Sequence, residues 1–154
     1  MKLENSLFDI IINIICIIQL VGMTIYLIVV WGSLPEQIPG HFDVSGAVTR
    51  YDGKWVLLIS PIVAFVLFAG ICVLERFPSV WNTGVRVTEE NQFRIYRILK
   101  SLLAVSKLIV VTAFTFITIF QTLAVSLPVW FTPLFLTLTF VAIAFFIVRL
   151  VRAR

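Results

Sequence analysis

Charge is what this sequence lacks most. Only 13% of its 154 residues are Asp, Glu, Lys or Arg, whereas 60% are apolar and the mean hydropathy is +1.08. A soluble globular domain carries about 25% charged residues, so this chain has too few to cover a surface that faces water. The scarcity excludes an ordinary soluble domain and predicts an integral membrane protein.

Histidine and cysteine are also scarce, with one His and two Cys in the chain. Cys16 and Cys72 both lie within apolar runs, where neither an oxidant nor a metal ion readily reaches a thiol. A disulfide scaffold is therefore excluded, and we expect both cysteines to be small buried filler. A single histidine lacks the paired spacing of zinc enzymes, so we expect no metal and no other cofactor.

Four apolar runs are each long enough to cross a bilayer as a helix of about 20 residues. Backbone amides in lipid must be paired within their own segment, so we expect these runs to be helical. The first run is too long for a signal peptide and no small-residue cleavage site follows it, so we expect it to stay in the mature chain. Residues 1–154 are thus predicted to form one all-α membrane domain with spans at residues 7–30, 55–74, 101–126 and 128–150.

Basic residues are divided unevenly between the two sides of such a protein. With four spans, the loop of residues 31–54 lies on one side, and both termini and the loop of residues 75–100 lie on the other. The loop 31–54 and its border carry only Arg50 and Lys54. The opposite side carries nine basic residues: Lys2, Arg76, Arg86, Arg94, Arg97, Lys100, Arg149, Arg152 and Arg154. Because basic loops stay in the cytosol, we expect both termini inside and the loop 31–54 outside.

The net charge of +4 does not indicate nucleic-acid binding. The basic residues lie at membrane boundaries, where they hold the topology and meet anionic lipid. No basic stripe with a stacking module accompanies them, so we expect membrane lipid rather than nucleic acid as a partner.

The predicted cytosolic loop has two parts. Pro78 and Gly84 break any helix early in the loop. Thr88 is then predicted as the N-cap of a helix, with Glu89 and Glu90 complementing its positive end. Alternating apolar and basic residues follow, which favours an interfacial helix that continues into the third span. We expect a topological anchor, with a docking face for a cytosolic partner or lipid headgroup as the alternative.

Polar residues within the spans allow two interpretations. We expect them to join helices through hydrogen bonds; the main ones are Asn13, Gln19, Thr112, Thr115, Thr118, Gln121, Thr122 and Ser126. The alternative is a path for an ion or substrate, as in a small transporter or channel subunit that forms a homo-oligomer. Such a path normally needs ionisable groups at mid-membrane, and we expect Asp9, Glu75 and Lys107 to lie near the cytosolic boundary.

The loop 31–54 concentrates residues that form turns. Pro35 and Pro39 fix the backbone and push the residues before them toward extended conformations. Gly40, Gly46 and Gly53 permit tight turns between them. We therefore expect one structured extracytoplasmic loop that folds back on the membrane face. Its expected apolar or interfacial anchors are Phe42, Val44, Tyr51 and Trp55.

His41 is the residue of this loop with the most chemical options. It is expected to hydrogen-bond the loop backbone, or to contact a ligand with a charge that responds to external pH. A membrane enzyme centred on His41 is a further alternative, with Glu36, Asp43 and Asp52 as the other zinc ligands. A Ser-His-Asp arrangement with Ser33 or Ser45 lacks a nucleophile-elbow glycine pattern. We expect the chain not to be an enzyme.

The stretch LPEQIPGHFDVSGAVTRYDGKW resembles the signature of a bacterial family of small membrane proteins of unknown function, roughly Leu-Pro-x-x-Ile-Pro-x-His-Phe-x-x-x-Gly. The matching residues are Leu34, Pro35, Ile38, Pro39, His41, Phe42, Gly46, Tyr51 and Lys54. A weaker second pattern is matched by Asn82, Val85, Thr88, Glu89, Glu90, Asn91 and Tyr96. The chain departs from the family at Thr49, where Asp is usual, and at Asp52, where Gly is frequent.

That module is similar to the amino-terminal part of immunity proteins that protect bacteria from the sporulation-delay toxin and hold a transcriptional repressor at the membrane. The resemblance implies a multi-pass protein of the bacterial cytoplasmic membrane. It also implies recognition of a secreted peptide or toxin outside and of a regulatory protein inside. The residues expected to make the outer contacts are His41, Phe42, Tyr51 and Lys54, on a scaffold of Pro35, Pro39 and Gly46.

Overall fold

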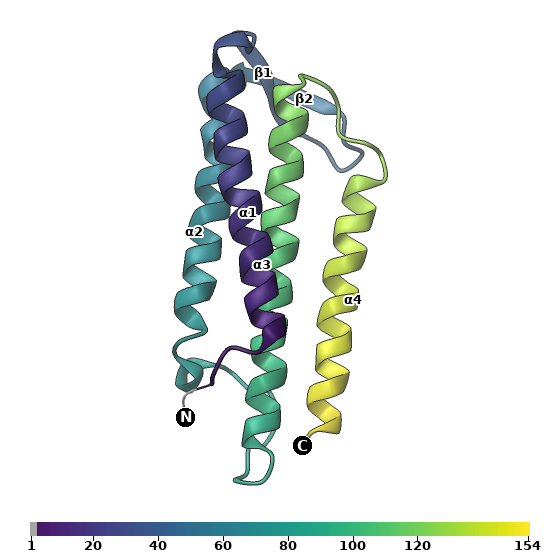
Figure 1. The fold of residues 1–154 in the computed structure, drawn as a ribbon. Helices are drawn as coiled ribbons and strands as arrows, with labels where there is room; N and C mark the ends of the chain where they lie inside the picture. Colours follow the sequence, from purple (N-terminus) through teal and green to yellow (C-terminus); the bar gives the residue numbers. More distant parts are fainter. Residues whose placement is uncertain (1–2) are drawn as a thin grey trace.

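The computed structural model describes residues 3–154 and consists mainly of four long helices that stand side by side (Figure 1). These are α1 (Leu7–Val30), α2 (Ile59–Leu74), α3 (Gln92–Thr122) and α4 (Phe131–Arg152). Strands β1 (Gln37–Phe42) and β2 (Val48–Gly53) form an antiparallel hairpin at one end of the molecule. We call this the hairpin end, and we call the opposite end, where the chain begins and finishes, the terminal end.

All four helical segments are long and apolar enough to cross a membrane: Leu7–Ser33, Lys54–Leu74, Gln92–Thr122 and Phe131–Arg152. Their outward faces are exposed and apolar, with Ile18, Ile25, Phe65 and Phe140 as examples. Such faces suit contact with lipid rather than water. The predicted four-span, mostly helical membrane protein is confirmed at this level.

The observed helix bounds differ from the predicted spans mainly at α3. The first span matches α1, and the second is formed by a short 3-10 helix (Lys54–Leu58) followed by α2. α3 begins nine residues before the predicted span and ends four residues before its predicted end. The amphipathic segment that precedes the span continues into it without a break, as the alternation of apolar and basic residues predicted.

The predicted N-cap at Thr88 is wrong. α3 begins at Gln92, and Asn91 occupies the N-cap position without a side-chain capping bond. The Thr88 amide instead donates to Asn91 Oδ1 at 2.8 Å, and the Gln92 amide donates to the Thr88 carbonyl at 2.9 Å. These bonds form a turn ahead of the helix, so Glu89 and Glu90 lie in the turn rather than in the first helical turn.

The core of the molecule lies between α1, α2 and α3. Buried positions on α1 recur every three or four residues, so they share one face of the helix. This face packs with small residues such as Ala64 of α2 and Ala104 of α3, and Cys16 is fully buried there as expected. α4 lies outside this bundle and packs on α3, mainly through Phe146 and Leu150 near the terminal end.

Candidate functional site at the hairpin end

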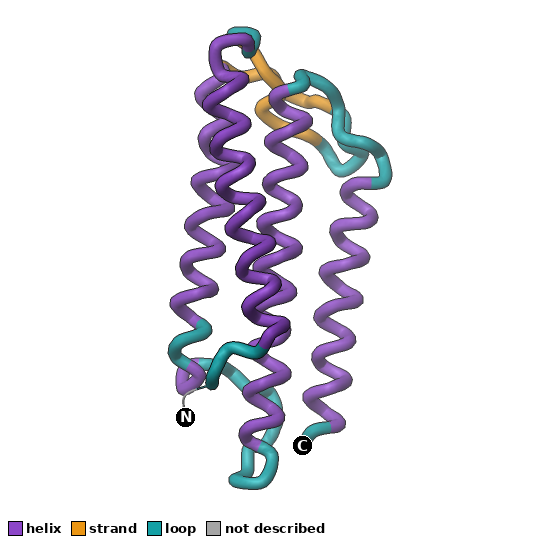
Figure 2. Tube along the Cα trace, in the orientation of Figure 1, coloured by secondary structure: helices purple, strands orange, loops and turns teal. Residues whose placement is uncertain are grey.

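The segment between α1 and α2 forms a β-hairpin, which the sequence did not predict. Pro39 pairs with Tyr51 and His41 with Arg50, with irregular register around His41. Figure 2 shows the two strands lying across the hairpin end of the helices, with the tip directed toward the connection between α3 and α4. The loop is therefore ordered by strand pairing as well as by its prolines and glycines.

The base of the hairpin is buried against the helices. Ile38 has no exposed surface and packs with Leu27 and Leu57. Pro39 is also buried, and its carbonyl accepts a hydrogen bond of 3.0 Å from Gln121 Nε2 of α3. Since Pro39 has no amide hydrogen, this carbonyl is its only backbone group that can hold the strand to the bundle.

The tip of the hairpin is attached to the connection between α3 and α4. Gly46 has a φ of +87°, and a Cβ at this position would collide with the Leu127 carbonyl. The Leu127 amide donates to the Gly46 carbonyl at 2.8 Å. The expected scaffold role of Gly46 thus has a physical basis, because only glycine fits both the backbone conformation and the close approach.

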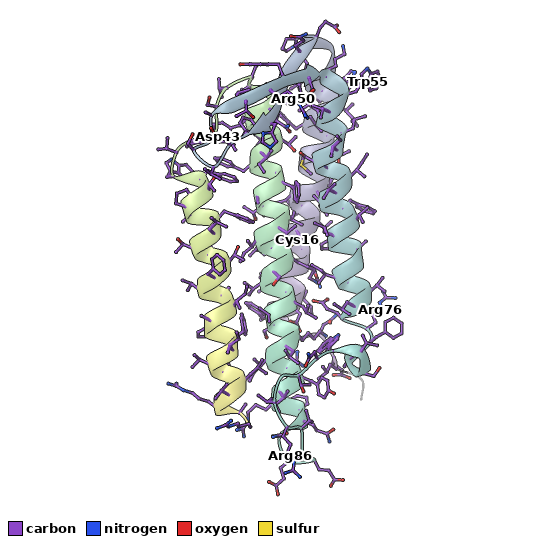
Figure 3. The ribbon with its side chains drawn as sticks, turned by 180° about the vertical axis from the view of Figure 1, so that it is seen from behind. Cys16, Asp43, Arg50, Trp55, Arg76 and Arg86 are labelled. Carbon is purple, nitrogen blue, oxygen red and sulfur yellow. The ribbon has the colours of Figure 1, made fainter. Side chains whose placement is uncertain are left out.

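Asp43 closes the turn at the tip. Its Oδ1 accepts hydrogen bonds from the Ser45 hydroxyl at 2.6 Å, the Ser45 amide at 2.8 Å and the Ala47 amide at 3.1 Å. These bonds, above all the one from the Ser45 hydroxyl, hold the pKa of Asp43 below its ordinary value. Figure 3 shows Asp43 on the side of α4, away from Trp55.

Four polar side chains of the hairpin are exposed or only partly covered, and they form two contacting pairs. The pairs are His41 with Thr49 and Arg50 with Asp52. His41 Nδ1 lies 2.6 Å from Thr49 Oγ1, and Thr49 Oγ1 donates to the His41 carbonyl at 3.3 Å. Arg50 Nε donates to Asp52 Oδ2 at 2.8 Å. The two residues that depart from the family pattern, Thr49 and Asp52, are therefore the direct partners of His41 and Arg50. Tyr51 is 56% exposed beside them.

Lys54 and Pro35 are placed differently from the exposed residues. The Lys54 side chain is only 23% exposed, because it lies 3.6 Å from Glu36 and 5.8 Å from the centre of the Trp31 ring. It closes the base of the hairpin rather than pointing outward. Pro35 is exposed in the bend before β1.

The expected apolar anchors are mostly uncovered by protein. Val44 is 81% exposed at the tip, and Tyr51 and Trp55 are exposed as well. Phe42 alone is half-buried.

The alternative zinc site around His41 is not assembled. Within residues 3–154, no three His, Cys, Asp or Glu side chains gather closely enough to hold a metal ion. Asp43 is occupied by the turn and Asp52 by Arg50. The side-chain partner that the structure gives His41 is a threonine hydroxyl.

At the terminal end, several of the predicted motif residues form contacts within the loop, and several are exposed. Asn82 Oδ1 accepts from the Gly84 amide, and Asn91 Nδ2 donates to the Arg86 carbonyl. The Tyr96 ring lies 5.9 Å from the ring of Trp81, whose indole donates to the Leu74 carbonyl. The exposed motif residues are Asn82, Thr88, Glu89 and Glu90. Lys2, counted among the basic residues of this end, lies outside the described residues.

A buried ionic cluster joins α1, α2 and α3 and was missed by sequence reasoning. Lys107 is 1% exposed, and its Nζ donates to Asn13 Oδ1 at 2.6 Å and to Glu75 Oε2 at 2.8 Å. Cys72 Sγ lies 3.6 Å from the same ammonium, so Cys72 contacts a charge and is not plain filler. Ala104 and Val111, three and four residues from Lys107, are fully buried, so the three residues share the face of α3 that points into the bundle.

A second ionic cluster lies closer to the terminal end. Asp9 Oδ2 accepts from Arg97 Nη1 at 2.9 Å and lies 3.9 Å from Lys100 Nζ. Lys100 also donates to Asn5 Oδ1 at 2.7 Å, and Ser6 forms a capping box with Asp9. These contacts attach the segment before α1 to α3.

The threonines of α3 join helices less than expected. The Thr115 and Thr118 hydroxyls donate to carbonyls of their own helix. Thr122 Oγ1 reaches another helix, at 2.9 Å from the Tyr26 hydroxyl, and Gln121 bonds Ser60 as well as the hairpin. The expectation of interhelical bonds is therefore confirmed for Gln121 and Thr122 at the hairpin end and for Asn13, which accepts from Lys107. Thr115 and Thr118 do not make such bonds.

Residues 18–65 match a family model described as a domain of unknown function (DUF1648). The matched segment covers the second half of α1, the whole hairpin and the start of α2. It agrees with the predicted resemblance to a family of unknown function. No curated protein and no solved structure matches the chain.

Proposed function

We propose that this chain is a multi-pass protein of the bacterial cytoplasmic membrane that recognises a secreted, membrane-active peptide through its hairpin. The observation that carries the proposal is an ordered polar surface on a fixed base. His41, Arg50 and Tyr51 are exposed, while Pro39 and Gly46 tie the same hairpin to the helices. Preorganised side chains lose little conformational entropy on binding, which favours recognition.

The proposed orientation places the hairpin outside and the terminal end in the cytosol. Its support is the excess of Lys and Arg at the terminal end, since such residues are retained on the cytosolic side. The test is labelling of intact cells with a membrane-impermeant maleimide, using Val44→Cys at the hairpin tip and Glu89→Cys in the opposite loop. Labelling of the first variant alone supports the orientation, and labelling of the second alone reverses it.

Recognition at the hairpin would use both polar and apolar contacts. His41 and Arg50 are partners across the two strands, and the exposed Tyr51 offers a ring and a hydroxyl. Val44 at the tip adds an apolar contact suited to a peptide that inserts into membranes. Inside the cell, the exposed Glu89 and Glu90 would offer an acidic surface to a regulatory protein.

The deciding experiment is a protection assay. A susceptible bacterium expresses the chain and is challenged with sporulation-delay toxin and related membrane-active peptides. The variants His41→Ala and Tyr51→Ala are compared at matched protein levels with Ser33→Ala, whose hydroxyl bonds the Val30 carbonyl away from this surface. We expect wild type and Ser33→Ala to protect and the other two to lose protection. Equal protection by wild type and all three variants would show that these hairpin residues take no part in protection.

A small transporter is the second candidate, favoured by one observation. Glu75, at the end of α2, and Lys107 of α3 form a buried ionisable pair, and an ion path through the bundle would need ionisable groups. The test is proton flux into vesicles reconstituted with wild type or Glu75→Gln. Flux that depends on Glu75 would favour this candidate over peptide recognition, and absence of flux would dismiss it.

A further inference from the structure

α4 contacts α3 through apolar side chains toward both of its ends. At the hairpin end, the ring of Phe131 on α4 stacks on that of Phe116 on α3, with centroids 4.7 Å apart. At the terminal end, Phe146 and Leu150 pack into one cluster with Ile98. A groove of about 890 Å³ runs along the two helices past these contacts, and Phe116, Phe131 and Phe146 themselves line it. Figure 1 shows α4 as the outermost helix of the four.

The groove has an apolar body and one charged end. Most of its walls come from α3 and α4, and Phe8 of α1 contributes as well. The lining residues of α3 and α4 include Leu108, Ile109, Thr112, Leu138, Ala142 and Phe145. Arg149 lines the terminal end, where its guanidinium lies 5.7 Å from the centre of the Phe145 ring. None of the lining residues is acidic, and within residues 3–154 no carboxylate forms a salt bridge with Arg149. The guanidinium is therefore available to pair with an anion at the terminal end of the apolar groove.

The length and the charge of the groove indicate its occupant. Its lining runs from Trp130, the N-cap of α4, to Arg149, which at 1.5 Å per residue is about 28 Å, close to the thickness of a bilayer core. A molecule in this groove therefore meets apolar side chains at the depth of the acyl chains and a cation at one membrane boundary. A phospholipid with an anionic headgroup has this distribution of apolar and charged groups.

We propose that the groove between α3 and α4 binds an anionic phospholipid. The phosphate pairs with the Arg149 guanidinium, which offers two parallel N–H donors to such a group. The acyl chain lies along Phe145, Ala142 and Leu108 in the half of the groove nearest the terminal end, because one leaflet supplies about half the bilayer thickness. The site requires only that the helices cross a membrane, and it does not depend on peptide recognition by the hairpin.

The headgroup contact is tested by native mass spectrometry of the detergent-purified chain with equal amounts of phosphatidylglycerol and phosphatidylcholine. We expect wild type to retain one phosphatidylglycerol in preference to phosphatidylcholine. Arg149→Gln should weaken retention of the anionic lipid roughly fivefold, the effect of one basic group at a lipid surface. Arg152→Gln is the matched control, because Arg152 lies one turn on and does not line the groove. Equal retention of the two lipids by wild type, or equal losses in the two variants, would overturn the proposal.

The acyl contact is tested by filling the groove. Ala142→Phe should abolish retention of both lipids, whereas Ala144→Phe, at an exposed position outside the groove, should retain them. If Ala142→Phe does not fold, an anionic phospholipid with a photoreactive group at mid-chain is crosslinked to wild type in vesicles. Labels should fall within 105–112 and 138–146. Labels spread evenly over Ile14 and Ile18, exposed residues of α1 that do not line the groove, or a lipid-free dimer in the mass spectrum, would contradict the assignment.

Discussion

The two ends of the α1–α3 bundle are joined by different chemistry. Toward the terminal end, helices are linked by charges: Lys107 to Glu75 at 2.8 Å and Arg97 to Asp9 at 2.9 Å. At the hairpin end they are linked by neutral groups, such as Gln121 to the Pro39 carbonyl. Removing one partner costs about 3–5 kcal/mol at a buried ion pair and about 1–3 kcal/mol at a buried neutral hydrogen bond, because the remaining group is left unpaired. Loss of one side-chain link is therefore expected to cost less at the hairpin end than at the terminal end.

α4 differs from both ends of the bundle. Among residues 3–154, no ion pair and no side-chain hydrogen bond connects α4 to another helix. It is held by apolar packing on α3 and by the chain connection at Leu127, which also bonds Gly46. A ligand that moved the hairpin tip would thus act on the helix that is least firmly attached.

The largest predicted effect comes from breaking the buried pair. Lys107→Met leaves the Glu75 carboxylate without its cation, and Glu75 is only 9% exposed. We expect a loss of about 3–5 kcal/mol in the free energy of unfolding. The measurement is unfolding by dodecyl sulfate in mixed micelles, followed by circular dichroism.

Two further variants control this measurement. Lys107→Met combined with Glu75→Gln should recover most of the loss, since no charge then lies buried. Lys54→Met at the hairpin end should cost about 0–1 kcal/mol, because its partner Glu36 is largely exposed. Equal losses for Lys107→Met and Lys54→Met would mean that the two ends do not differ as described.

The next effect concerns the tip of the hairpin. Gly46→Ala should lower the free energy of unfolding by about 2–3 kcal/mol, because positive φ costs about 1–2 kcal/mol and the Cβ also meets the Leu127 carbonyl. Gly84→Ala is the control, since Gly84 has a φ of +63° but open space around its Cβ, and should cost about 1–2 kcal/mol. An equal cost for the two substitutions would show that the contact with Leu127 is loose.

The helices were predictable from sequence, because crossing a lipid layer requires long apolar runs whatever their neighbours. The hairpin was not, since Pro39 and Gly40 within β1 disfavour a strand. Their presence is explained by the site: the Pro39 carbonyl faces Gln121, and a Cβ on Gly40 would collide with Asp52. Local propensity was overridden by contacts with a helix 82 residues away.

For the candidate site, sequence identified the segment but not the role of each residue. His41 and Tyr51 are exposed as a binding role requires, whereas Lys54 is folded over Trp31. The pairing of Lys107 with Glu75 was missed for a different reason. Hydropathy predicts that a helix spans, but it does not give the rotation of the helix about its axis, and that rotation decides which side chains meet.

A smaller effect is expected at the base of the hairpin. Gln121→Leu removes the donor to the Pro39 carbonyl with little change in volume, and should cost about 1–2 kcal/mol because a buried carbonyl is left unpaired. Gln19→Leu is the matched control on α1. Within residues 3–154, Gln19 Oε1 is buried without a hydrogen-bond partner, so this change should be neutral or stabilising. A neutral Gln121→Leu would mean that apolar packing of Ile38 alone holds the hairpin.

The smallest predicted effect is the pH response of the turn at Asp43. Hydrogen bonds from Ser45 and Ala47 keep the pKa of Asp43 below its ordinary value of 3.8. The turn therefore contributes its full stability above that value and loses it as the pH falls through the lower pKa of the folded protein. A nuclear magnetic resonance titration of the Ser45 and Ala47 amides in micelles should give a midpoint below 3.8. Ser45→Ala, which removes the hydroxyl that lowers the pKa most, should raise the midpoint, while Ser33→Ala should not. If Ser45→Ala left the midpoint unchanged, the Ser45 and Ala47 amides alone would hold the Asp43 carboxylate. The Ser45 hydroxyl would then not contribute to the order of the hairpin tip.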